Sequence, residues 1–106
     1  MKLIDLIIFF RRGGAFEDFC RDQLFDTESE AIEIYAQEPV NLESQLGFFP
    51  IEETGSRIEF QSGGILYHNF FDFFYFLDAI EDIRRSEGLT DVEIAQKLFS
   101  YAINDA

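Results

Sequence analysis

The stretch from residue 70 to residue 86, FFDFFYFLDAIEDIRRS, carries the clearest helical pattern of the chain. Its apolar residues recur at the three- and four-residue spacing that places side chains on one face of an α-helix. Asn69 and Asp72 resemble a capping box before the run, and Gly88 follows it as a stop signal. We predict an amphipathic helix over 70–86 whose central apolar stripe is Phe70, Phe73, Phe74, Leu77 and Ile80.

The segments outside this stretch carry further helix signals. Thr90 and Glu93 form a capping box before apolar residues at helical spacing, which predicts a C-terminal helix. Residues 15–25 have one apolar and one charged face and are also predicted to be helical. Residues 2–12 fit a buried helix, which we favour, and their Ile and Phe content also fits a central strand.

Residues 27–38 carry two conflicting signals. Thr27 and Glu30 form a capping box, which favours a helix. Ile32 and Ile34 alternate with polar or aromatic neighbours, which is typical of a strand. We favour a helix here because several acids precede it, and acids stabilise a helix N-terminus.

Residues 40–56 are rich in turn signals, and the sheet of the molecule is predicted around residues 48–68. A hairpin that pairs 48–53 with 57–61 fits the turn at residues 54–56, and Gly63-Gly64 leads to a possible third strand at 65–67. The predicted fold class is therefore α+β: a mostly helical single domain over 1–106, with four to five helices and a small antiparallel hairpin or three-stranded sheet around residues 48–68. One hydrophobic core is feasible at this length.

The charge of the chain bounds the kind of partner it binds. The chain has 106 residues, and its 21 Asp and Glu against 8 Lys and Arg give a formal net charge of −13. Such a surface repels nucleic-acid phosphates and anionic lipids and attracts basic proteins. The apolar run at residues 3–10 is far shorter than the roughly 20 residues that span a bilayer. We expect a cytoplasmic protein with a basic protein partner, without nucleic acid and without a membrane.

No residue pattern in the chain predicts catalysis. Cys20 and His68 are the only residues of their types, so a zinc site lacks ligands and a Cys–His pair has a single candidate. Cys20 falls on an apolar helix face, where a free cysteine usually packs as a small hydrophobe. The two Gly-Gly pairs lack the patterns that cradle phosphate. We therefore predict no enzyme activity, no metal site and no cofactor.

The best candidate contact surface is a row of aromatic and acidic residues on the predicted helix 70–86. Phe71, Tyr75, Asp78 and Asp82 follow one another at steps of four, three and four residues, away from the apolar stripe. Aromatic side chains anchor protein interfaces, and acids attract Lys and Arg. A core this rich in Phe could instead cover the two rings. Further acids are expected on exposed faces: the pair Glu52 and Glu53 at the hairpin tip, and the group Asp26, Glu28, Glu30 and Glu33.

Size, acidity, aromatic richness and missing catalytic motifs together give the chain a resemblance to bacterial immunity proteins. These protect a cell against toxins of the colicin or contact-dependent growth inhibition kind. The resemblance implies a protein that blocks a basic toxin, such as a nuclease, by covering its active site or substrate groove. Two alternatives stay open: a nucleic-acid mimic that inhibits a DNA- or RNA-binding protein, and a small assembly subunit without catalytic activity.

Overall fold

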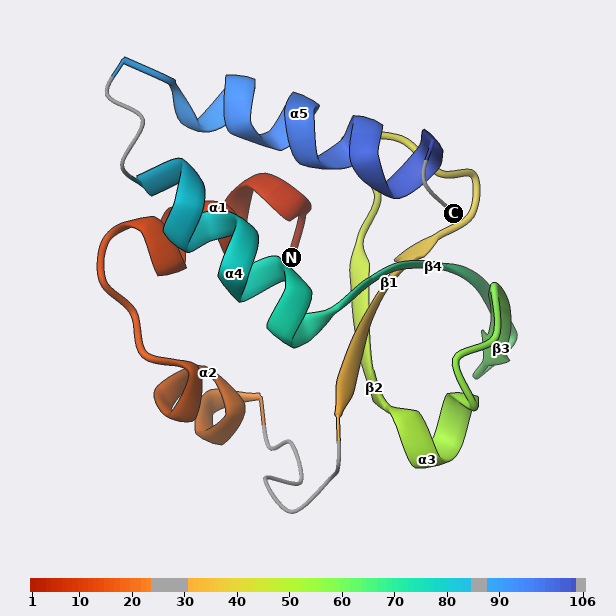
Figure 1. Ribbon diagram of the computed structural model, residues 1–106. Helices are drawn as coiled ribbons and strands as arrows, with labels where there is room; N and C mark the ends of the chain where they lie inside the picture. The colour runs from red at the N-terminus through yellow and green to blue at the C-terminus, as the bar shows by residue number, and fades with distance from the viewer. Residues whose placement is uncertain (24–30, 85–87, 105–106) are drawn as a thin grey trace.

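The computed structural model describes residues 1–23, 31–84 and 88–104, which form helices and one antiparallel sheet (Figure 1). The helices are α1 (Leu3–Arg11), α2 (Phe16–Asp22), α3 (Ile51–Thr54), α4 (Phe73–Arg84) and α5 (Asp91–Asn104). The strands are β1 (Ile32–Gln37), β2 (Leu46–Pro50), β3 (Glu59–Ser62) and β4 (Ile65–Asp72). The predicted α+β class is confirmed. The expected sheet of two or three strands was too small, and the description as mostly helical was imprecise.

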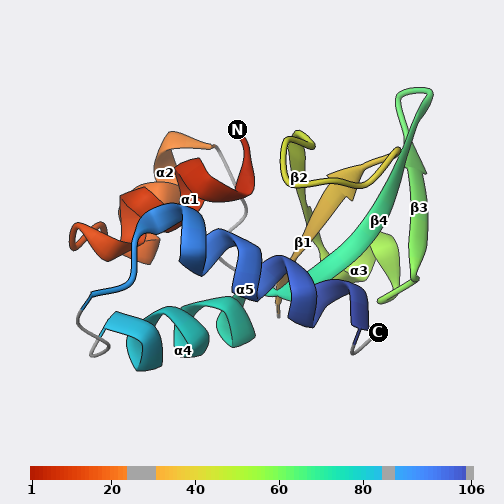
Figure 2. The ribbon, with the colours of Figure 1, turned by 90° about the horizontal axis from the view of Figure 1, so that it is seen from above.

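The four strands lie in the order β2-β1-β4-β3, and every neighbouring pair is antiparallel. The sheet curls into a half-barrel beside the helices, of which α4 and α5 both pack against α1 (Figure 2). The predicted turn at Gly63-Gly64 is confirmed, because it joins β3 to β4 with both glycines at positive φ, 57° and 79°. Glycine adopts this backbone region without the steric penalty of a Cβ atom.

The prediction of a helix over 27–38 is wrong for the part that the structure describes, because residues 32–37 form β1. Ile32 and Ile34 belong to the main core, whereas Glu33 and Tyr35 point to the opposite face and are buried there as well. The alternation of Ile32 and Ile34 was thus the correct signal. Thr27 and Glu30, which suggested the helix, lie outside the described residues.

The predicted hairpin of 48–53 with 57–61 is also wrong. β2 pairs with β1 instead, with Phe48 opposite Ile34, and β3 pairs with β4. Between β2 and β3, the chain forms the short helix α3, which ends at Gly55 with φ 62°. The turn signal at residues 54–56 therefore ends a helix and does not close a hairpin. Glu52 and Glu53 are exposed on α3 and do not lie at a hairpin tip.

Helix α4 begins later than predicted, because Asn69 to Asp72 extend strand β4. Asp72 is the residue that caps the helix: its Oδ1 accepts hydrogen bonds from the N–H groups of Phe74 at 2.8 Å and Tyr75 at 3.4 Å. Phe74 is 52% exposed and is not part of the apolar stripe, which was a further error. The buried face of α4 consists of Phe73, Phe76, Ile80 and Ile83.

A bulge in β4 explains how consecutive phenylalanines reach one core. The register with β1 shifts, so that Ile34 lies opposite Phe71 while Tyr35 lies opposite Asn69. Successive strand residues normally alternate between faces, and a bulge interrupts that alternation. Phe70 and Phe71 are accordingly both buried in the main core, where they contact each other.

The predicted helices at the two ends of the chain are confirmed. Residues 3–11 form α1 and residues 16–22 form α2, although positions 24 and 25 of the predicted second helix lie outside the described residues. The capping box before α5 is present, with reciprocal bonds of 3.2 Å between the backbone N–H groups and side chains of Thr90 and Glu93. Arg11 joins α1 to the start of α5 through Asp91 at 2.9 Å and the Leu89 carbonyl at 2.6 Å.

Candidate functional site

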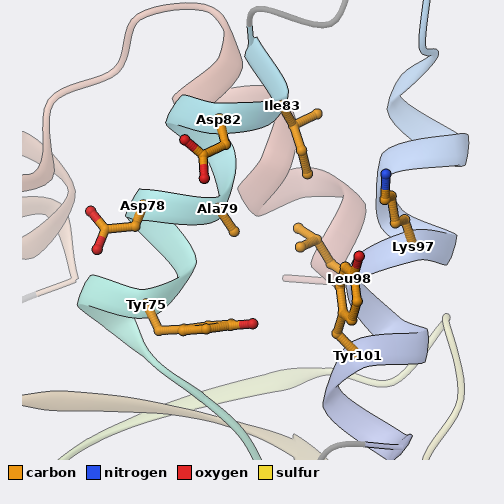
Figure 3. A pocket seen from close by; sticks show the side chains of 8 residues that line it. All are labelled: Tyr75, Asp78, Ala79, Asp82, Ile83, Lys97, Leu98 and Tyr101. Carbon is orange, nitrogen blue, oxygen red and sulfur yellow. The ribbon is translucent and has the colours of Figure 1, made fainter.

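A groove of about 570 Å³ runs between α4 and α5 (Figure 3). Both helices pack against α1, which fixes their spacing from behind. The lining residues come from α4 and α5 alone: Tyr75, Asp78, Ala79, Asp82, Ile83, Lys97, Leu98 and Tyr101. The groove is therefore a cleft between two helices, with side chains of both walls accessible.

The base of the groove is apolar and one end of it is aromatic. Ile83 and Leu98 are buried core residues whose side chains face the space between the helices (Figure 3). Tyr75 and Tyr101 are 52% and 43% exposed, and the Tyr75 ring extends from α4 toward α5. Large exposed aromatics over an apolar base are typical of surfaces that bind another molecule.

Buried Phe71 supports the ring of Tyr75. The two rings are stacked, with centroids 5.8 Å apart and planes 17° from parallel. Phe71 is itself 5% exposed and contacts Phe70 and Phe76 in the core. Tyr75 is thus an exposed ring on a rigid base, which lowers the entropy that a partner must overcome to order it.

The two walls of the groove carry opposite charges. Asp78 and Asp82 lie one helical turn apart on α4, and their carboxylates point away from α5 along the outer rim (Figure 3). Lys97 stands on the opposite wall and is exposed. No ion pair of Lys97 with another described residue is present. The groove therefore has an apolar centre and a charged rim, as protein interfaces do.

Of the residues predicted for partner contact, three meet in this groove: Tyr75, Asp78 and Asp82. Phe71 lies in β4 and not on the helix, so the four residues do not form one helical row, and Phe71 acts from beneath Tyr75. Glu52 and Glu53 lie on α3, which packs against the opposite face of the sheet, and they do not join the groove.

The wall that α5 contributes could not be predicted from the sequence. In the sequence, Tyr101 only broadens the apolar face of the last helix, and no pattern sets Lys97 apart. Their place beside α4 depends on how α5 packs against α1, and no local pattern encodes that contact.

A buried polar network on the other face of the sheet is a second feature that the sequence did not predict. Glu33 is 5% exposed, which contradicts its prediction as part of an exposed acidic group. Its carboxylate accepts hydrogen bonds from the Thr54 hydroxyl at 2.5 Å and the Asn69 amide at 2.9 Å. The remaining acids of that group, at positions 26, 28 and 30, lie outside the described residues.

Tyr35 extends the same network. Its hydroxyl donates a hydrogen bond of 2.7 Å to the Arg57 carbonyl and accepts one of 3.3 Å from Asn69. Burial raises the pKa of Tyr35 above its ordinary value of 10, and the nearby Glu33 charge acts in the same direction. Among the described residues, every buried side-chain polar atom has a hydrogen-bond partner, so the network is closed and offers no free group to a ligand.

The residues considered for catalysis are separate in the structure. Cys20 is buried in the helical core, where burial raises the pKa of its thiol and disfavours the reactive thiolate. His68 lies on β4, not ahead of a helix, with its Nδ1 3.7 Å from the Glu38 carboxylate. Within the described ranges, no three His, Cys, Asp or Glu side chains are grouped so that they could hold a metal ion.

None of the helices in the described part of the chain has the length and apolar character needed to cross a membrane. Comparisons with protein-family models, curated proteins and solved structures found no match.

Proposed function

We propose that this chain is a non-catalytic binding protein that captures a basic protein partner in the groove between α4 and α5. In the reading that its resemblance to immunity proteins suggests, the partner is a toxin, and the chain neutralises it by covering its active site or substrate groove. The observation that carries the proposal is the exposed Tyr75 ring, which lies over an apolar base on a helix whose outer rim carries the carboxylates of Asp78 and Asp82.

The parts of the groove match the tasks of an interface. Tyr75 and Tyr101 are half-exposed rings of the type that dominates binding energy when a partner buries them. Asp78 and Asp82 sit at the rim, where charges mainly set the association rate and the choice of partner. Such a surface slows dissociation through its aromatic centre and speeds capture through its acidic rim.

The net charge of −13 supports a basic partner over a second copy of the chain. Two copies would bring two strongly negative surfaces together, which costs free energy at low ionic strength. A basic partner would gain from the same field, which can raise association rates toward about 10⁸–10⁹ M⁻¹s⁻¹ at low salt.

The test is a comparison of the native chain with the variant Asp78→Lys/Asp82→Lys. Tagged forms of both are used to purify partners from the source cells, and the partner is then prepared pure for measurements of affinity, salt dependence and inhibition. We expect a basic protein whose activity the native chain abolishes, and whose association rate falls about tenfold or more with the variant.

A matched control separates the groove from general charge. Asp22→Lys/Glu59→Lys makes the same change in net charge at two exposed acids, on α2 and β3. The control should bind the partner nearly as the native chain does. If both double variants weaken binding equally, the groove is not the contact surface, and if the partner keeps its full activity in the complex, the inhibitory function is wrong.

A further inference from the structure

We propose that the α4 wall of the groove is an arginine subsite: an arginine side chain of the partner stacks its guanidinium on the Tyr75 ring and faces the carboxylates of Asp78 and Asp82. This inference rests on the proposed function and names the chemistry that the groove selects. An arginine subsite prefers arginine to lysine, whereas a general attraction between acidic and basic surfaces does not distinguish the two residues.

Tyr75 provides the aromatic face of the subsite. Phe71 stacks on Tyr75 at 5.8 Å between centroids and is fixed in the core, so one face of the Tyr75 ring is supported. The side chain is still 52% exposed, and it lies across the end of the groove (Figure 3). A cation above the free face of such a ring is attracted by its negative π-system.

Asp78 and Asp82 provide the negative charge of the subsite. Asp78 follows Tyr75 by three residues and Asp82 follows Asp78 by four, so ring and acids occupy successive turns of α4, with the ring extending toward α5 and the carboxylates on the outer rim (Figure 3). Neither acid makes an ion pair with another described residue. A planar guanidinium can stack on an aromatic face and donate its edge N–H groups to a carboxylate at once, whereas a compact, strongly hydrated ammonium does this less well.

The opposite wall of the groove carries a positive charge. Lys97 places a positive charge on α5, across the groove from the acids. Like charges repel, so a partner cation is disfavoured near α5 and favoured beside α4. The groove thus fixes on which side the arginine enters, and leaves Lys97 for an acidic or polar group of the same partner.

The test uses two short capped peptides of identical sequence except that each basic position is arginine in one and lysine in the other. Titration calorimetry gives both affinities, and NMR shifts of the tyrosine rings locate the binding. We expect the arginine peptide to bind the native chain about two- to fivefold more tightly, with shifts at Tyr75.

Substitutions on α4 assign this preference to the ring. Tyr75→Leu should lower the arginine-to-lysine ratio to about one, while Tyr75→Phe should keep it, because Phe retains a π-face. Phe74→Leu is the matched control: Phe74 is equally exposed on the same helix but does not line the groove. This control should leave the ratio unchanged.

The outcomes separate this inference from the function on which it rests. Equal affinities of the two peptides for the native chain, or a ratio that survives Tyr75→Leu, overturn the arginine subsite. If Asp78→Lys/Asp82→Lys still weakens both peptides in that case, the groove for a basic partner stands. If this double variant binds both peptides as the native chain does, the subsite and the proposed function fail together.

Discussion

At the scale of single residues, Glu33 is a carboxylate buried on the sheet face opposite the helices. A buried charge is tolerated only when hydrogen bonds replace the water that it has lost. Thr54 and Asn69 supply these bonds, and they come from α3 and β4. The network therefore ties the short helix α3 to β1 and adds a side-chain link to the backbone pairing of β1 with β4.

Replacement of Thr54 by Val should measure the strength of this tie. Val keeps the branched shape but removes the hydroxyl that donates to Glu33, so the carboxylate loses a partner inside the protein. We expect a loss of about 1–3 kcal/mol in the free energy of unfolding, measured with urea. Ser62→Ala is the control, since the Ser62 hydroxyl makes no hydrogen bond with the described residues. A Thr54→Val chain as stable as the native one would show that the bond to Glu33 contributes little.

Tyr35 predicts a dependence of stability on alkaline pH. Burial raises the pKa of Tyr35, so above pH 10 the unfolded chain loses the phenolic proton while the folded chain still holds it. The folded state then binds more protons, and the free energy of unfolding falls as the pH rises through the folded pKa. Urea unfolding at a series of pH values, in the native chain and in Tyr35→Phe, measures this slope. The variant should show a smaller decrease; equal slopes in the two chains would contradict the assignment to Tyr35.

At the scale of elements, the start of α4 is the place where two candidate caps can be told apart. Asp72 accepts the N–H groups of Phe74 and Tyr75, whereas Asn69 belongs to β4 and to the Glu33 network. Asp72→Ala should therefore cost about 0.5–2 kcal/mol of stability, measured by urea unfolding followed by circular dichroism. Asp72→Asn should lose much less, because Asn is also a good cap. A large loss in both variants would mean that the charge of Asp72, and not its capping bonds, is what matters.

Elements with signals at their own ends could be predicted from the sequence. Thr90 and Glu93 encode the start of α5 within four residues, and the spacing of Leu3, Leu6 and Phe10 encodes the buried face of α1. The strands were harder, because their partners are distant in sequence: the neighbours of Ile34 are Phe48 and Phe71. At β1, the capping box of Thr27 and Glu30 favoured a helix and the alternation of Ile32 and Ile34 favoured a strand. Only the pairing of β1 with β2 and β4 decides between the two signals.

The same contrast holds for the groove. Tyr75, Asp78 and Asp82 could be predicted together because one helical period relates them. Lys97 and Tyr101 could not, because they meet α4 only through the packing of α5 on α1. The bulge between Phe71 and Asn69 was likewise beyond local patterns, and it moved Phe71 from the predicted helix surface into the core.

At the scale of the whole molecule, the two features of interest lie on different sides of the sheet. The helices on one side form the groove, and the Glu33 network with α3 occupies the other. Changes in the network should therefore lower stability and leave partner affinity nearly unchanged, whereas changes at the groove rim should lower partner affinity. Sites that share no partner usually contribute independently.

The net charge gives the last prediction, in which affinity and stability change in opposite directions. Asp78→Lys/Asp82→Lys relieves part of the repulsion within a chain of net charge −13, and it places a cation in the last turn of α4, where the helix dipole favours one. We expect the variant to be about 0.3–1 kcal/mol more stable than the native chain at low salt.

The measurement is urea unfolding in about 0.02 M and about 0.5 M NaCl, because salt screens surface charges and should remove most of the difference. Asp22→Lys/Glu59→Lys changes the net charge equally and ends α2 with a cation, so its stability should rise in the same way. Partner affinity should fall only in the groove variant. A groove variant that loses stability at low salt would show that Asp78 and Asp82 support the fold, and its loss of binding could then no longer be attributed to contact with the partner.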